Sequence, residues 1–118
     1  MSGEEAREGF AAFMLRMRAA GIGSHQLFTA MEATPRSRFV AGQWAQDAWT
    51  NGMIPIACGE AIESPDLQAS ALSALDLQES NRVLEVGTGT GFTAAVMARL
   101  AARVLSVDRF RTLANEAR

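Results

Sequence analysis

The chain has 118 residues, of which 48% are hydrophobic, and a formal net charge of −2 at pH 7. This length and composition suit one globular domain with a buried core and exclude an intrinsically disordered protein. The nearly balanced charge predicts no nucleic-acid partner, and no apolar run approaches the roughly 20 residues that a membrane-spanning helix needs.

The first third of the chain predicts helices. A helix is expected over residues 4–20, because Ser2 and Glu5 fit a capping box. Four residues form one apolar stripe along it: Phe10, Phe13, Met14 and Met17. A second helix is predicted after the cap Ser24, and a further helical turn over residues 35–40.

Three polar residues in this region are candidate ligand-binding groups. His25 is the only histidine, and without a cysteine cluster or a second histidine it predicts no metal site and favours a surface or capping role. Arg36 and Arg38 can bind an anion, but the expected state of such a pair is two solvated guanidinium groups.

The middle of the chain predicts short elements and then a helix. Residues 53–56 predict an extended segment, in which Pro55 excludes a central strand of a sheet. Residues 58–63 predict a loop. Ser64-Pro65 combines an N-cap with proline at the first helical position and predicts a helix that ends near residue 77.

The last third of the chain alternates between strand and helix patterns. A strand over residues 83–86 meets a glycine-rich turn, which opens into a helix to about residue 101, and a second strand at 104–107 precedes another helix. We therefore predict an α/β fold. Residues 1–63 form a helical N-terminal extension and a substrate-side loop, and residues 64–118 form the first two βα units of a truncated Rossmann-like parallel sheet.

The cysteine content and the N-terminus predict the compartment. Cys58 is the only cysteine, which excludes an intrachain disulfide and fits a reducing cytoplasm. The acidic segment Met1–Glu5 lacks the basic-then-apolar order of a signal peptide. We expect a cytoplasmic protein with no membrane partner.

The glycine spacing distinguishes two kinds of cofactor loop. Glycines stand at positions 87, 89 and 91, with Glu85 two residues before the first. A dinucleotide-binding G-x-G-x-x-G loop needs glycine where Phe92 stands. Asp108 stands at the end of the next predicted strand, where a carboxylate can accept hydrogen bonds from both hydroxyls of a ribose.

The E-x-G-x-G-x-G pattern resembles motif I of class I S-adenosylmethionine-dependent methyltransferases. Two upstream segments narrow the resemblance, the P-R-x-x-F-V turn at residues 35–40 and the P-I-x-x-G segment at residues 55–59. Over about residues 10–114 the chain resembles protein-L-isoaspartate O-methyltransferases. The resemblance implies S-adenosyl-L-methionine as the cofactor, bound by Ile62, Glu85, Gly87, Thr88, Gly89, Gly91 and Asp108.

The same resemblance implies an enzyme of protein repair. It would transfer a methyl group from S-adenosylmethionine to the carboxylate of L-isoaspartyl residues, so its partners would be isoaspartyl-containing proteins or peptides. A carboxylate is already nucleophilic at neutral pH, so such catalysis consists mainly of aligning the acceptor with the donor. It needs no catalytic histidine or cysteine.

One position departs from the family pattern. The active-site serine of the family falls on Glu63, the candidate catalytic residue here, and its threonine falls on Ala61. An ionised Glu63 cannot donate a hydrogen bond to a substrate carboxylate and would repel it. Either Glu63 is protonated, or Ser64 substitutes for the serine, or the acceptor differs, or Glu63 is a solvated loop residue.

The number of predicted strands is small for this family. We expect the chain to be a fragment or a truncated product that binds the cofactor weakly or not at all by itself and is inactive alone. Exposed sheet edges are expected to favour self-association.

Three other functions compete with the leading one. A methyltransferase for another acceptor would use Glu63 as a general base. A non-catalytic remnant would serve as a binding module. An NAD-dependent oxidoreductase is disfavoured by Phe92.

Overall fold

The computed structural model describes residues 2–118, and Met1, the first residue of the predicted extension, lies outside the described residues. The α-helices are α1 (Gly3–Ala19), α2 (His25–Glu32), α3 (Pro65–Leu75), α4 (Phe92–Ala98) and α5 (Arg111–Glu116). The strands are β1 (Ile54–Pro55), β2 (Ala61–Ile62), β3 (Arg82–Val86) and β4 (Arg103–Val107), and 3-10 turns cover Arg36–Phe39, Gly42–Asp47 and Ala57–Gly59. The α/β fold with N-terminal helices and two βα units is confirmed.

Local capping signals set the helix starts. The hydroxyl of Ser2 accepts a hydrogen bond from the Glu5 N–H, and the Glu5 carboxylate accepts one from the Ser2 N–H, which confirms the capping box of α1. Ser24 caps α2, and Ser64 caps α3, which begins with proline. Helix α3 ends two residues before the predicted position, because Asp76 adopts a left-handed conformation with φ of 47°.

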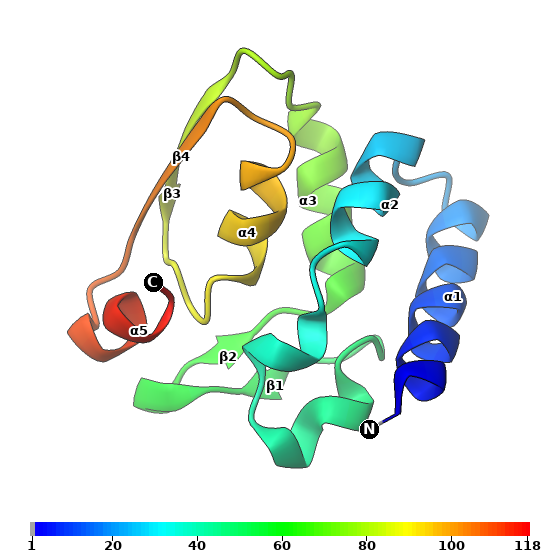
Figure 1. Cartoon of the computed structure of the whole chain (residues 1–118), viewed down its shortest axis with the longest axis horizontal. Coiled ribbons are helices and arrows are strands. Elements are labelled where there is room, and N and C mark those ends of the chain that lie inside the picture. The colour runs from blue at the N-terminus through cyan, green and yellow to red at the C-terminus, as the bar shows by residue number, and fades with distance from the viewer. Residues whose placement is uncertain (1) are drawn as a thin grey trace.

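The two longest strands are parallel neighbours that are covered on one face. Strands β3 and β4 pair along their full length, and Figure 1 shows α1 to α4 on the same side of them. The other face exposes four apolar side chains in two register pairs: Leu84 with Leu105, and Val86 with Val107. Parallel sheets are normally covered on both faces, so this bare face lacks its usual cover.

The predicted loop over residues 58–63 contains a strand, which corrects that prediction. Strand β2 pairs with β1 in an antiparallel hairpin. Cys58 and Gly59, with φ of 64° and 71°, reverse the chain between the strands, and left-handed backbone at a non-glycine position is hard to foresee from sequence. Pro55 lies in a two-residue ladder, as its exclusion from a central strand required.

Aromatic residues join the N-terminal helices to the βα units. The Trp49 ring lies 4.9 Å from the Phe10 ring and 5.1 Å from the Phe13 ring, measured between centroids. On its other side Trp49 lies 5.9 Å from Phe92, the first residue of α4. The hydrophobic core is therefore continuous from α1 to the start of α4. No helix within residues 2–118 has the length and apolar character required to cross a membrane.

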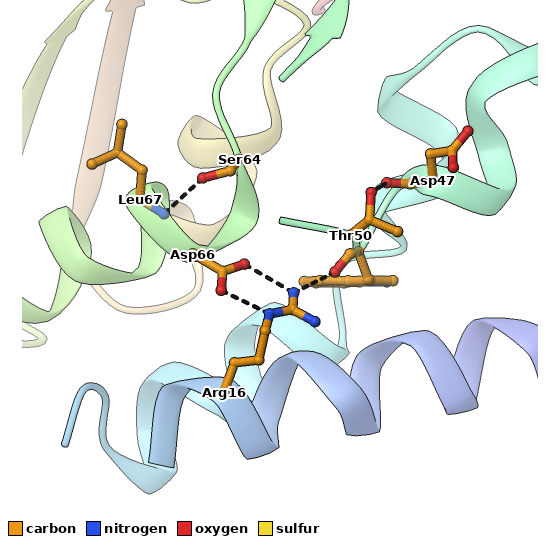
Figure 2. Close-up of polar contacts among 7 residues, drawn as sticks. Arg16, Asp47, Thr50, Ser64, Asp66 and Leu67 are labelled. Atoms are coloured by element: carbon orange, nitrogen blue, oxygen red, sulfur yellow. Dashed lines mark hydrogen bonds and ion pairs between the residues drawn. The ribbon is translucent and has the colours of Figure 1, made fainter. Parts of the chain in front are cut away.

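An ion pair fixes the start of α3 against α1 (Figure 2). Arg16 donates from Nε and Nη2 to the two carboxylate oxygens of Asp66, at 2.8 and 2.9 Å, and Nη2 also donates to the carbonyl oxygen of Trp49 at 2.6 Å. The hydrogen bond to Asp66 raises the pKa of Arg16 above its usual value. The pair therefore joins α1, the segment before β1 and the first turn of α3.

We expect Arg16→Met to lower the free energy of unfolding by about 1–3 kcal/mol, because the Asp66 carboxylate is mostly buried and would lose its charged donor. Arg7→Met, at an exposed position of the same helix, is the matched control and should change stability by less than about 0.5 kcal/mol. Urea unfolding of both variants measures this. Equal losses for the two would contradict the role of the pair.

Candidate functional site

The glycine-rich loop follows directly from β3 and is held to the end of β4. The N–H groups of Gly87 and Thr88 both donate to the carbonyl oxygen of Val107, at 2.7 and 3.1 Å. Gly87, Gly89 and Gly91 have φ of 97°, 57° and 96°, a region that side chains disfavour. All three predicted glycines are therefore required by the conformation of the turn.

The glycines differ in what surrounds them. A Cβ atom on Gly91 would lie 3.1 Å from the Cβ of Ala117, so Gly91 also allows the loop to approach the segment after α5. A Cβ on Gly87 would meet nothing within 4 Å. The first glycine thus leaves an open backbone surface, whereas the last lies under the C-terminal segment.

Asp108 joins the ends of the two βα units. Its Oδ1 accepts a hydrogen bond from the Phe110 N–H at 2.9 Å, and its Oδ2 accepts one from the Gly89 N–H at 3.0 Å. These two hydrogen bonds lower the pKa of the Asp108 carboxyl below its usual value. Each carboxylate oxygen keeps a further lone pair, so Asp108 can still accept hydrogen bonds from a ligand.

Glu85 lies beneath the loop and binds hydroxyl groups. Its carboxylate accepts hydrogen bonds from Thr93 of α4 and from Ser106 of β4, the latter at 2.6 Å. The hydroxyl of Ser106 in turn lies 2.7 Å from that of Thr88. Through these contacts Glu85 supports the loop from below.

Two small pockets lie on either side of the loop. One, of about 170 Å³, brings the predicted residues Ile62, Glu63 and Thr88 together with the loop glycines Gly87 and Gly89. We call it the Glu63 pocket. The other, of about 280 Å³, is lined by the same two glycines and by Asp108. Two predicted site residues line neither pocket in this structure: Glu85 and Gly91.

The predicted site residues lie at the glycine loop and not in the cavity beside α2. A cavity of about 730 Å³ lies between α2 and residues 77–80 and contains none of the predicted site residues. Residues 2–118 hold no group of three histidine, cysteine or acidic side chains arranged for a metal ion, and His25 is exposed at the start of α2.

Arg36 is buried, so the prediction of a solvated pair is wrong for this residue and correct for the exposed Arg38. Arg36 donates to the carbonyl oxygens of Ala48 and Glu63, the latter at 2.7 Å, and to Oε1 of Gln68 at 2.6 Å. Burial lowers the pKa of Arg36 to about 10, so it remains a cation at neutral pH. The sequence signal that could have indicated a structural role for Arg36 was its place in the P-R-x-x-F-V turn at residues 35–40.

Sequence reasoning also missed Gln68 and Thr90, which line the Glu63 pocket. The Thr90 hydroxyl is shielded from solvent and has no hydrogen-bond partner among the described residues. A buried hydroxyl without a partner is costly, and a polar ligand atom at the loop would satisfy it.

Comparison with known sequences identifies relatives of most of the described region. The sequence model of the protein-L-isoaspartate(D-aspartate) O-methyltransferase family matches residues 9–118. The chain is 46% identical over 103 residues to a protein-L-isoaspartate O-methyltransferase of Rhizobium meliloti, covering 87% of this chain and 50% of the relative. A protein-L-isoaspartate O-methyltransferase 2 of Rhodopseudomonas palustris is 46% identical over 106 residues, covering 90% of this chain and 49% of that protein. The chain thus spans about half the length of the curated relatives it matches.

Solved structures share the fold. A protein-L-isoaspartate O-methyltransferase of Plasmodium falciparum, solved in complex with S-adenosyl-L-homocysteine, superposes with a TM-score of 0.76 at 20% identity, over 90% of this chain and 51% of that chain. Another protein-L-isoaspartate O-methyltransferase structure gives a TM-score of 0.74 at 23% identity, over 92% of this chain and 36% of its own.

The lowered pKa of Asp108 predicts an acid-sensitive contribution to stability. Its ionised form is favoured in the folded state, so its contribution is complete above the ordinary carboxyl pKa of about 4 and is lost as pH falls through the lower folded value. Asp108→Asn should remove this part of the pH dependence. NMR titration of the Asp108 carboxyl checks the shift directly, and a titration midpoint at or above the ordinary value would contradict it.

Proposed function

Since this chain belongs to the protein-L-isoaspartate O-methyltransferase family, we propose that it supplies the donor loop and the acceptor-side segment of an enzyme that methylates the free carboxylate of isoaspartyl residues in proteins. The cofactor in this proposal is S-adenosyl-L-methionine, and the partners are isoaspartyl-containing proteins or peptides. The proposal divides the chain into residues 1–63, the helical N-terminal extension with the substrate-side loop, and residues 64–118, the partial Rossmann-like domain.

One observation carries the proposal: the Gly89 N–H and the Asp108 carboxylate meet at the carboxyl ends of two parallel strands. This edge is where open α/β sheets bind their ligands. Asp108 would hold the ribose hydroxyls, and the open backbone surface at Gly87 would lie against the methionyl part. Glu85 would hold the loop in place from below through its hydrogen bonds with Thr93 and Ser106. Three further residues complete the proposed cofactor site: Ile62, Thr88 and Gly91.

The residues present fit this cofactor. The Cβ-free surface at Gly87 admits a ligand close to the backbone, and the unpaired hydroxyl of Thr90 lacks only a polar partner. When bound, S-adenosylmethionine supplies a methyl group that is already activated by its sulfonium. The chain therefore needs no general base for a carboxylate acceptor and contributes by holding the acceptor in line.

One observation favours a second candidate function. Glu63 is exposed, forms no hydrogen bond through its side chain within residues 2–118, and lines the pocket beside the loop. A free carboxylate at that place suits a general base toward an amine or hydroxyl acceptor. The second candidate is therefore methyl transfer to such an acceptor.

Cytoplasmic action and self-association are also part of the proposal. Each of β3 and β4 has one unpaired edge, and the bare face carries the four exposed apolar side chains described above. Such surfaces favour pairing between copies.

We expect the 118-residue chain alone to bind S-adenosyl-L-homocysteine weakly or not at all, because much of the relatives' length is not part of it. A chimera in which it replaces the matching segment of the Rhizobium meliloti protein should bind this ligand and methylate an isoaspartyl peptide. Calorimetry and transfer of a labelled methyl group measure the two properties. A micromolar dissociation constant for the chain alone would overturn the expectation of weak binding. A chimera that folds but does not methylate the peptide would overturn the expectation of activity.

Glu63→Ser in the same chimera separates the two candidate functions. Removing the repelling charge and adding a hydroxyl donor should lower the KM for the isoaspartyl peptide by about tenfold. If Glu63 is instead a base for another acceptor, the substitution should abolish methylation of that acceptor and leave the KM for the isoaspartyl peptide unchanged.

Self-association should grow with concentration and depend on the bare face. Leu84→Glu introduces a charge at an exposed strand position and should shift the chain toward the monomer. Sedimentation velocity over a concentration series tests this, with Leu15→Glu on the exposed side of α1 as the control. A monomeric wild-type chain at all concentrations would refute self-association.

A further inference from the structure

Arg36 is a buried cation whose direct partners are all neutral. It donates to the carbonyl oxygens of Ala48 and Glu63 and to the amide oxygen of Gln68. The carboxylate that acts on it through space is Asp66, which itself forms a two-point ion pair with Arg16. The positive charge of Arg36 is therefore only partly offset, and it lies behind the wall of the Glu63 pocket.

This contact also fixes which way the Gln68 amide faces. Its Oε1 accepts from Nη1 of Arg36 at 2.6 Å, so its Nε2 points away from the guanidinium. An amide nitrogen carries two N–H donors, and the side-chain hydrogen bond that Gln68 forms with Arg36 uses only its Oε1, which leaves Nε2 free to donate. Gln68, which lines the Glu63 pocket, therefore carries a free amide donor next to a buried cation.

These fixed groups select an anion. The Glu63 carboxylate is exposed and unbonded, so it can turn into solvent, whereas Arg36 and Gln68 are held by their mutual hydrogen bond. A carboxylate in the pocket gains from both the donor and the positive potential. A neutral ligand gains only the hydrogen bond.

We propose that Gln68, oriented by Arg36, donates from Nε2 to the acceptor carboxylate in the Glu63 pocket and so supplies the donor that Glu63 cannot. Gln68 contacts the substrate in this scheme, and Arg36 is a positioning residue. The proposal rests on the proposed function for the identity of the acceptor, but the anion site itself is a property of this chain.

Titration of the 15N-labelled 118-residue chain by NMR tests the site with three probes. They are a blocked peptide with an isoaspartyl residue, N-acetylglycine, which carries only a carboxylate, and N-acetylglycinamide, which carries none. We expect the side-chain N–H₂ signals of Gln68 to shift much more with the first two probes than with the third at equal concentration. Gln68→Leu should weaken binding of both carboxylates about tenfold or more.

Gln43→Leu is the matched control, because Gln43 is exposed outside the pocket, and it should leave the affinities unchanged. Arg36→Lys keeps the charge but loses the fork of donors, so the Gln68 signals should broaden and the carboxylate affinity fall. The wild-type titration remains decisive even where a variant fails to fold.

The outcomes separate the two proposals. If N-acetylglycine binds and the isoaspartyl peptide does not, the result supports Gln68 as a donor to a carboxylate and rules out the isoaspartyl residue as the acceptor. Gln68 signals that stay fixed with both carboxylates, or that move equally with the neutral amide, overturn the donor role and leave the cofactor loop untouched.

Discussion

The contacts of Arg36 set the relative positions of the two halves of the candidate site. Its guanidinium joins the chain before β1, the residue that directly follows β2 and a side chain within α3, and lies 4.6 Å from the ring centroid of Phe92. Phe92 directly follows the glycine loop. A buried cation is tolerated only where its donors are satisfied, so every segment that supplies an oxygen is fixed with it. Through these contacts Arg36 fixes the position of Glu63 relative to the glycine loop.

The cofactor side is rigid for a different reason. Left-handed glycines turn the chain back toward β4, and each polar group beneath the turn has a partner: Glu85 takes two hydroxyls and Asp108 takes two backbone N–H groups. The hydroxyl of Thr90 is the exception. The loop is therefore well supported from below and open from above, which is the arrangement that backbone recognition of a small ligand requires.

Sequence reasoning predicted what short-range signals determine. The capping box of α1, the Ser64-Pro65 start of α3 and the order of strand, glycine turn and helix all depend on neighbours within a few residues. It placed Arg36 in solvent because no local pattern shows that Gln68, 32 positions later, will accept its hydrogen bond. It read residues 58–63 as a loop because the left-handed conformation of Cys58 depends on the pairing of β1 with β2. The pocket-lining roles of Gln68 and Thr90 were missed because both appear in the sequence as ordinary helix and turn residues.

The four apolar side chains on the bare face of β3 and β4 indicate the state in which these strands were selected. In β3 and β4 the exposed residues of that face are apolar at these four positions, whereas the half-buried residues toward α4 include the polar Glu85 and Ser106. Polar substitutions at positions 84, 86, 105 and 107 would cost an uncovered chain little stability and would improve its solubility. Leucine and valine at all four positions therefore mark these strands as the product of selection in a covered state.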